Sequence, residues 1–270
     1  MRLLSLVLLS VSLASTLDAA EFSPKWQGTR IWVGPDCWAN PMQEWAIRDG
    51  ALVAEPNGPD RSVIALTAQI RGGAPAAIEM DVSLEGRAPN PQFAKAWFGG
   101  FWVGVRSKMD DPLHVAAYPE GHLVAGMRGD GAIVLGNRAS EEKLPADRPT
   151  RIRLVVEPKG EMAVLRLEAS QPGRTMICLK DEVPAEAAAG CFGIGASAPK
   201  RNANTPADRP SWRFAAWRAS GDGVAAHPGR AFGPILWTQY TLGRGILKLT
   251  AQMPPVGEGD AKEVRLEMRR

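Results

Sequence analysis

The sequence predicts an all-β protein, an antiparallel sandwich of two sheets, on three observations. Apolar residues recur with a period of two along most of the chain, which is the pattern of half-buried strands. Asp-Gly and Lys-Gly pairs separate short apolar segments and supply the backbone conformations that tight hairpins need. Helical periodicity is almost absent. Many short strands without intervening helices are typical of a β-sandwich.

Three segments predict hairpins in which two apolar arms flank a turn. Residues 44–55 and 122–136 each contain an Asp-Gly pair, and residues 151–170 turn at Lys159 and Gly160. Further strands are expected at residues 62–70, 77–85, 98–107, 175–182, 191–197 and 213–220. Only residues 184–190 suit a helical turn, closed by Gly190. This order of elements fits a jelly roll of the concanavalin A or laminin G type.

The N-terminus has the pattern of a secretory signal peptide. Arg2 precedes an apolar run from Leu3 to Leu13, and small residues lead to Ala20. Residues 1–20 are therefore expected to be cleaved, and no later segment is apolar enough for a membrane span. The mature protein is predicted to be secreted or periplasmic.

Changes in composition predict the domain borders. The sandwich is expected over residues 21–220, with the polar, Pro-rich stretch 198–210 as an exposed loop. Residues 221–231 have the composition of a linker. Residues 232–270 form a short C-terminal β extension, with prolines around strand-like runs and a last strand expected at 261–268.

Charge and cysteine content limit the classes of partner. The net charge is +3 with both signs interspersed, which does not indicate a nucleic-acid partner. A disulfide between Cys178 and Cys191 is one option in an oxidising compartment, with Cys37 left over. The alternative is three small buried hydrophobic residues. No cysteine or histidine spacing indicates zinc.

The nearest approach to a catalytic signature is "EMDVSLE", with Glu79, Asp81 and Glu85. Jelly-roll glycosidases place carboxylates on one face of a strand, and a retaining pair needs a separation of about 5 Å. Six residues of extended strand separate Glu79 from Glu85 by roughly 20 Å. Apolar residues alternate with the acidic ones, which favours a half-buried strand with a solvent-facing acidic side. The three residues therefore remain only a weak catalytic alternative.

Other chemical signatures are weak. Ser197 lies in "GIGASAP", which departs from a nucleophile elbow. His114, His122 and His227 occur singly, without the neighbours that a metal site requires. The "RGD" ending at Asp130 coincides with a predicted turn. No catalytic, cofactor-binding or metal-ligating residue is assigned, and a structural calcium ion is left open.

The chain is rich in tryptophan, with nine residues at positions 26, 32, 38, 45, 97, 102, 212, 217 and 237. In a large sandwich most are expected in the core. An exposed indole can stack on a sugar ring, so a glycan is a candidate partner.

Three segments carry a resemblance to a known family: "CWANPMQEWAIRDGAL" at 37–52, "LVAGMRGDGAIVLG" at 123–136, and 232–268, with "GPILWTQYTL" and "LKLTAQMPP" the most specific parts. Together they resemble the N-terminal region of exported alkaline phosphatase D-like proteins. The resemblance implies a laminin G or concanavalin A-like sandwich followed by the start of a fibronectin-like domain. It also implies a setting of phosphate-ester scavenging, but the metallophosphoesterase domain and its metal ligands have no counterpart in these 270 residues.

Three function classes follow. The first is an exported, non-catalytic accessory module that contacts a glycan, the cell envelope or a phosphatase domain. The second is a concanavalin A-like glycan hydrolase or lyase using the carboxylates at Glu79, Asp81 and Glu85. The third is an interaction protein whose C-terminal strands complete a sheet of a partner.

Overall fold

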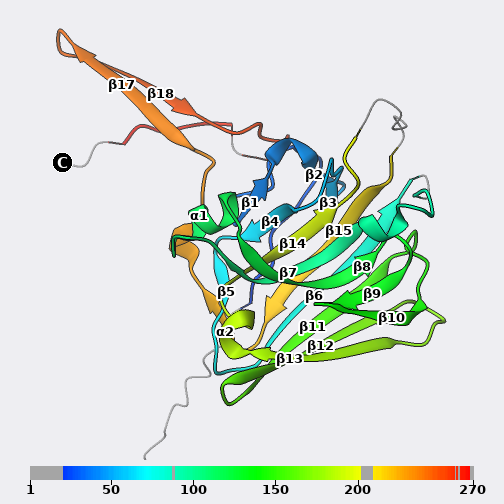
Figure 1. The fold of residues 1–270 in the computed structure, drawn as a ribbon. Coiled ribbons are helices and arrows are strands. Elements are labelled where there is room, and N and C mark those ends of the chain that lie inside the picture. The colour runs from blue at the N-terminus through cyan, green and yellow to red at the C-terminus, as the bar shows by residue number, and fades with distance from the viewer. Residues whose placement is uncertain (1–20, 87–88, 202–208, 259, 261, 268–270) are drawn as a thin grey trace, which may run out of the picture.

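The computed structural model describes residues 21–86, 89–201, 209–258, 260 and 262–267. The predicted signal peptide lies outside the described residues. Figure 1 shows two curved layers of strands packed face to face, with a two-stranded hairpin projecting away from them. Both large sheets are antiparallel, which confirms the predicted two-sheet sandwich.

Each large sheet contains seven strands and is named here for its central strand. The β7 sheet consists, in spatial order, of β1 (Cys37–Asn40), β4 (Arg61–Ala65), β14 (Cys191–Ser197), β7 (Phe98–Arg106), β8 (Gly121–Arg128), β9 (Ala132–Leu135) and β10 (Arg138–Lys143). The β6 sheet consists of β13 (Ile177–Pro184), β12 (Met162–Ser170), β11 (Thr150–Lys159), β6 (Ala76–Glu85), β15 (Ser211–Ser220), β3 (Ala51–Ala54) and β2 (Trp45–Arg48).

Smaller elements complete the described fold. Two pairs of strands form separate ladders: β5 (Ala68–Ile70) with β16 (Val224–Ala226), and β17 (Trp237–Gly243) with β18 (Ile246–Gln252). The helices are short: α1 (Pro112–Ala117), α2 (Ala185–Ala188), and the 3-10 turns η1 (Met42–Glu44), η2 (Ala94–Ala96) and η3 (Pro228–Arg230). None of the helices in the described parts of the chain is long and apolar enough to cross a membrane.

The three predicted hairpins form at the expected turns. Asp49 and Gly50 join β2 to β3 with φ angles of 49° and 72°, as a tight hairpin turn requires. Gly160 joins β11 to β12 with a φ angle of 64°. The turn between β8 and β9 contains Asp130, whose carboxylate pairs with Arg128 and Lys143. The "RGD" segment is therefore turn structure, as predicted.

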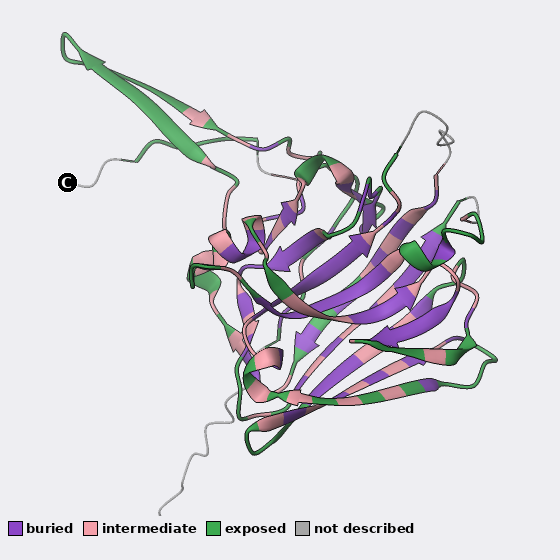
Figure 2. Cartoon of the chain, in the orientation of Figure 1, coloured by how far each residue is buried: buried purple, intermediate pink, exposed green. Residues whose placement is uncertain are grey.

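The core lies between the two sheets and follows the period-two pattern. On β6 the apolar side chains of Ile78, Met80 and Val82 are fully buried, and on β7 those of Phe101 and Val103 are too. Figure 2 shows this burial alternating along the strands, with the projecting hairpin exposed over nearly its whole length. The alternation in the sequence therefore identifies the inner faces of both sheets.

The outer face of the β7 sheet is also partly covered. A second apolar cluster there includes Ile64 and Trp102 from the sheet and Val115 and Ala116 from α1. Helix α1 begins at Pro112, and the Asp111 side chain accepts a hydrogen bond from the His114 backbone N–H at 2.8 Å. An Asp N-cap followed by proline is a helix-start signal that is present in the sequence.

Several predicted elements differ from the structure. The strand expected over 62–70 is divided into β4 and β5, because Leu66 and Thr67 turn aside to contact Asp36. The segment 221–231, predicted as a linker, contributes β16, and Val224 is buried. Residues 262–267, within the strand expected at 261–268, have no strand pairing. Strands β1 and β10 and helix α1 were not predicted from the sequence.

The disulfide considered between Cys178 and Cys191 is not formed. Cys178 is exposed on β13 of the β6 sheet, whereas Cys191 is buried on β14 of the β7 sheet. Because the two residues belong to different sheets, the short sequence separation does not bring their sulfur atoms together. All three cysteines are free thiols, and burial raises the pKa of the Cys37 and Cys191 thiols.

Candidate functional site

A groove of about 530 Å³ lies on the outer face of the β7 sheet. Its floor comes from β7 and β8, and its rim comes from the loop before β4 and the loop that leaves β14. The lining residues are Pro59, Asp60, Ala96, Phe98, Trp102, His122, Val124, Ser197, Ala198, Pro199 and Lys200. Volumes of roughly 300–1,000 Å³ are typical of sites for small ligands.

Glycines in the sheet allow the aromatic floor to form. Gly195 on β14 lies under Trp102, and a Cβ atom added there would overlap the indole ring. Gly100 lies under Phe98, where an added Cβ would come within 2.8 Å of the ring and closer still to the backbone of β8. Only glycine at these two positions lets the rings rest directly on the sheet.

Trp102 and His122 form a stacked pair at the centre of the groove. Their ring centroids are 3.7 Å apart and the ring planes differ by 15°. Trp102 is almost fully buried, so the half-buried His122 ring covers it on the groove side. Burial lowers the pKa of His122, and the nearby Asp60 carboxylate opposes this shift only in part. The imidazole is therefore neutral at pH 7 and adds an uncharged ring to the floor.

The rim carries the polar groups. Asp60 is exposed and has a φ angle of 61°, a left-handed conformation that aspartate tolerates better than most residues. Its backbone N–H lies 3.4 Å from the Ser197 hydroxyl, and the Ala198 N–H donates to the Gly58 carbonyl at 3.0 Å. Lys200 adds a cation on the same side. The groove thus offers a carboxylate, a hydroxyl and an ammonium group around an apolar floor.

This arrangement suits a ligand with one apolar face and several hydroxyl groups. An uncharged ring floor provides contact area without charge, while the rim provides both hydrogen-bond donors and acceptors. The Nδ1 atom of His122 is buried and has no hydrogen-bond partner among the described residues.

The weak catalytic alternative lies elsewhere. Glu79, Asp81 and Glu85 are on β6, and they point from the outer face of the β6 sheet. Glu79 is in ion-pair contact with three guanidinium groups: Arg218, Arg153 at 3.7 Å and Arg151 at 4.0 Å.

The other two carboxylates are also paired with arginine. Arg151 is 3.0 Å from Asp81, and Arg213 is 3.6 Å from Glu85. None of the three acidic side chains lines the groove or either of two further hollows in the described parts of the chain. They therefore form part of an ion-pair lattice on a strand, in agreement with the half-buried strand that their alternation predicts.

The tryptophans mostly have core positions. Six of the nine are buried, namely Trp26, Trp45, Trp97, Trp102, Trp212 and Trp217. Trp237 is 53 % exposed and lies on the projecting hairpin, outside the groove. The Trp102 indole lines the groove but is covered by the His122 ring. The groove therefore does not contain the exposed, sugar-stacking indole that the tryptophan content suggested.

Metal ligands do not gather in the described parts of the chain, where no three His, Cys, Asp or Glu side chains come close enough to hold an ion. The three histidines are separate. His114 is 2.8 Å from the Ser107 hydroxyl on the surface, and His227 precedes η3.

The positions of Trp102 and His122 can be inferred from the sequence, but the contact between their rings cannot. The period-two pattern places Trp102 and His122 on the outer face, because their neighbours Phe101, Val103 and Leu123 belong to the core. Their contact requires β7 and β8 to be neighbours in register. The groove's rim required the loops before β4 and after β14 to meet, which no local pattern indicates.

No protein-family model matches the sequence, and no curated protein is similar to it. Solved structures of plant lectins are similar in fold. The acidic lectin of winged bean, complexed with methyl-α-D-galactose, superimposes with a TM-score of 0.53 at 10 % identity, over 77 % of this chain and 100 % of the lectin.

Two further lectins superimpose to a similar extent. The basic winged bean lectin with Tn-antigen superimposes with a TM-score of 0.52 at 9 % identity, over 77 % of this chain and 99 % of the lectin. Lectin I-B4 of Griffonia simplicifolia superimposes with a TM-score of 0.52 at 11 % identity, over 75 % of this chain and 99 % of the lectin. The chain therefore has the concanavalin A-like jelly-roll sandwich fold of these lectins.

Proposed function

We propose that this protein is a carbohydrate-binding module and that the groove on the outer face of the β7 sheet is its glycan site. The observation that carries the proposal is the groove's composition. An uncharged ring floor of Phe98 and His122 lies beside the polar groups of Asp60, Ser197 and Lys200. A pyranose ring has a C–H face that packs on aromatic rings and hydroxyl groups that hydrogen-bond to a polar rim. The lectin-like fold supports the same class of ligand.

Glycan-array screening followed by calorimetry tests this proposal. Replacing Phe98 with alanine is expected to weaken binding about tenfold, because removing a ring contact of ~1.4 kcal/mol changes the dissociation constant by that factor. Asp60→Asn should weaken it too, since the rim then loses a charged acceptor. Tyr240→Ala and Asp222→Asn are matched controls outside the groove and should bind normally. Equal affinities for all five proteins would exclude the groove as the site.

The proposal includes export. The charged start, apolar run and small residues of 1–20 support a secreted or periplasmic location. N-terminal sequencing of the protein recovered from the culture medium or the periplasm should find a mature chain that begins near residue 21. Recovery of the intact chain from the cytoplasm alone would contradict export.

We also propose that the module acts as an accessory to an alkaline phosphatase D-like phosphoesterase. The resemblance at 37–52, 123–136 and 232–268 supports this, and so does the projecting hairpin. Cross-strand pairs place Tyr240 with Leu249 and Leu242 with Leu247 on one face of β17–β18. These four side chains are 41–72 % exposed.

An apolar face of this kind is suited to packing against further β structure of a fibronectin-like unit. Co-purification with the phosphoesterase domain of such an enzyme measures the association. If the Leu242→Ser protein co-purifies as well as the wild-type protein does, the apolar face of the hairpin does not contribute to the association.

A further inference from the structure

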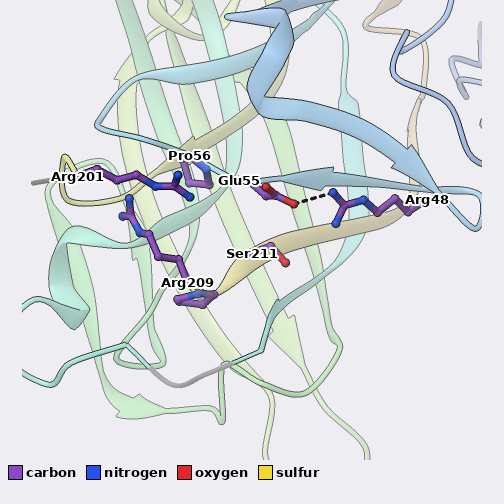
Figure 3. Close-up of a pocket in the computed structure, with 7 residues that line it drawn as sticks. Arg48, Glu55, Pro56, Arg201, Arg209 and Ser211 are labelled. Atoms are coloured by element: carbon purple, nitrogen blue, oxygen red, sulfur yellow. Dashed lines mark hydrogen bonds and ion pairs between the residues drawn. The ribbon is translucent and has the colours of Figure 1, made fainter. Parts of the chain in front are cut away.

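A second hollow, of about 250 Å³, lies beside the groove and is rich in arginine. Its wall includes Arg48, Glu55, Arg201, Arg209 and Ser211. Figure 3 shows the side chains of Arg201 and Arg209 directed into this hollow, while Glu55 turns toward Arg48. Three cations and one carboxylate therefore surround a space large enough for a small charged group.

The single carboxylate is already paired. Arg48 Nη2 lies 2.6 Å from Glu55 Oε1. Among the described residues, no carboxylate lies within ion-pair distance of Arg201 or Arg209. Arg201 and Arg209 thus share the hollow without an ion-pair partner from this part of the chain.

Arg209 is held in position before any ligand arrives. Its Nη2 donates to the Pro199 carbonyl at 2.7 Å, and its guanidinium carbon lies 5.0 Å from the centre of the Trp97 ring. Its Nη1 atom is buried and has no hydrogen-bond partner among the described residues. Burial, and then the charge of Arg201, lower the pKa of Arg209, while the charge of the Glu44 carboxylate opposes this shift. A bound anion would relieve both effects, since planar guanidinium groups bind carboxylates and sulfates through paired hydrogen bonds.

The arginine hollow and the groove share one wall. Pro199 and Lys200 line the groove, and the next residue, Arg201, lines the hollow. On the facing loop Glu55 and Pro56 belong to the hollow, and Pro59 and Asp60 to the groove. The Arg201 backbone N–H donates to Asn57 Oδ1 at 2.8 Å, which ties the two loops together. The groove and the arginine hollow are therefore adjacent to each other along these two loops.

We propose that Arg201 and Arg209 bind the anionic substituent of an acidic glycan whose neighbouring sugar lies in the groove. This inference rests on the proposed glycan binding and adds its ligand class: a saccharide that carries a carboxylate or sulfate group. Arg201 and Arg209 select for charge, and the ring floor of Phe98 and His122 binds the sugar face.

A matched pair of ligands tests the inference: an oligogalacturonate and the neutral oligosaccharide made from it by carboxyl reduction. Calorimetry at low ionic strength should give the wild-type protein at least about tenfold higher affinity for the acidic form, because charge-assisted hydrogen bonds to both guanidinium groups contribute only there. The preference should shrink as salt is raised. A sulfated galacto-oligosaccharide, as a third arm, identifies which anionic group is preferred.

Arg201→Gln should abolish most of the preference while leaving affinity for the neutral form unchanged. Arg201 is exposed, so this variant should fold. Arg209→Lys is a second variant that keeps the charge but loses the paired hydrogen bonds. Arg174→Gln removes an equal charge from an exposed turn between β12 and β13 and should retain the full preference.

The outcomes separate this inference from the proposed function. Binding of the neutral form with no acidic preference, or a preference that survives Arg201→Gln, would overturn the inference and leave the glycan proposal standing. If no saccharide binds, the glycan proposal fails. Titration with inorganic sulfate then tests separately whether the arginine hollow binds an anion. Sulfate that raises the melting temperature of the wild-type protein but not of Arg201→Gln supports an anion site. Equal effects on both proteins would overturn it.

Discussion

At the scale of single residues, the groove depends on what lies beneath its rings. Gly195 has no Cβ, and this allows the Trp102 indole to rest on the sheet and His122 to stack above it. The glycine and the two rings come from three different strands, β14, β7 and β8. A glycine that weakens a strand locally is retained where a large side chain must approach the backbone.

Gly195→Ala is predicted to destabilise the protein by about 1–3 kcal/mol, as expected for a group forced into a packed site. It should also abolish glycan binding, because the indole must move into the groove. Urea denaturation and calorimetry measure the two effects. Gly243→Ala is the matched control, since Gly243 also lies in a strand but has open space around it. Equal stability of the two variants would contradict the packing of Trp102 on Gly195.

The neutral state of His122 predicts a pH dependence of folding. Burial lowers its pKa below the value of 6.5 in the unfolded chain. Between the two pKa values the unfolded state binds more protons, so stability rises with pH. The free energy of unfolding should therefore fall as the pH drops below about 6.5. His122→Phe keeps a ring at the site but cannot titrate, and should show a shallower fall.

His227 requires a control in this measurement, because burial and Arg230 lower its pKa as well. His227→Gln should remove only its own part of the pH dependence. Denaturant unfolding at several pH values from 5 to 8 measures all three proteins. Identical slopes for the wild-type protein and His122→Phe would show that His122 titrates as in the unfolded chain.

At the scale of elements, the neighbours of β6 explain how three carboxylates in one strand are accommodated on a sheet face. Adjacent strands β11 and β15 supply arginines directly opposite the acidic residues: Arg153 and Arg218 are the register partners of Glu79. Cross-strand pairs of opposite charge stabilise an exposed sheet face. The acidic alternation seen in the sequence is therefore half of an ion-pair lattice, and the basic half comes from β11 and β15.

Glu79→Gln is predicted to lower the free energy of unfolding by about 1–2 kcal/mol, between the values for exposed and buried ion pairs. The Glu79 side chain is only 15 % exposed, and its loss leaves the guanidinium groups that surround it facing one another. Glycan affinity should not change, since β6 does not line the groove. Glu141→Gln on the exposed strand β10 is the control for charge removal. A normally stable Glu79→Gln protein would refute the structural role.

At the scale of the whole molecule, the sandwich separates two outer faces with different properties. The outer face of the β6 sheet carries paired charges, whereas the outer face of the β7 sheet carries the second apolar cluster and the groove. The hairpin β17–β18 belongs to neither sheet, and its side chains are almost all exposed. The proposed glycan binding and the proposed association with other β structure therefore involve separate parts of the chain.

The sequence by itself determined the fold class, most strands and the three hairpins. These follow from local information: period-two alternation, and turn residues such as Asp49, Gly50 and Gly160 whose conformations are set by their own chemistry. The helix at Pro112–Ala117 also has a local signal in the sequence, the Asp-Pro pair at its start.

Only the tertiary structure showed which residues come together in the groove and in the arginine hollow. Trp102 meets His122, and Arg201 meets Arg209 beside the groove, because sheet order and loop packing bring distant segments together. Alternation indicates which face a side chain occupies, but two sheets provide four faces, and local pattern does not identify which strands share one. For the same reason Cys178 and Cys191, close in sequence, lie in different sheets.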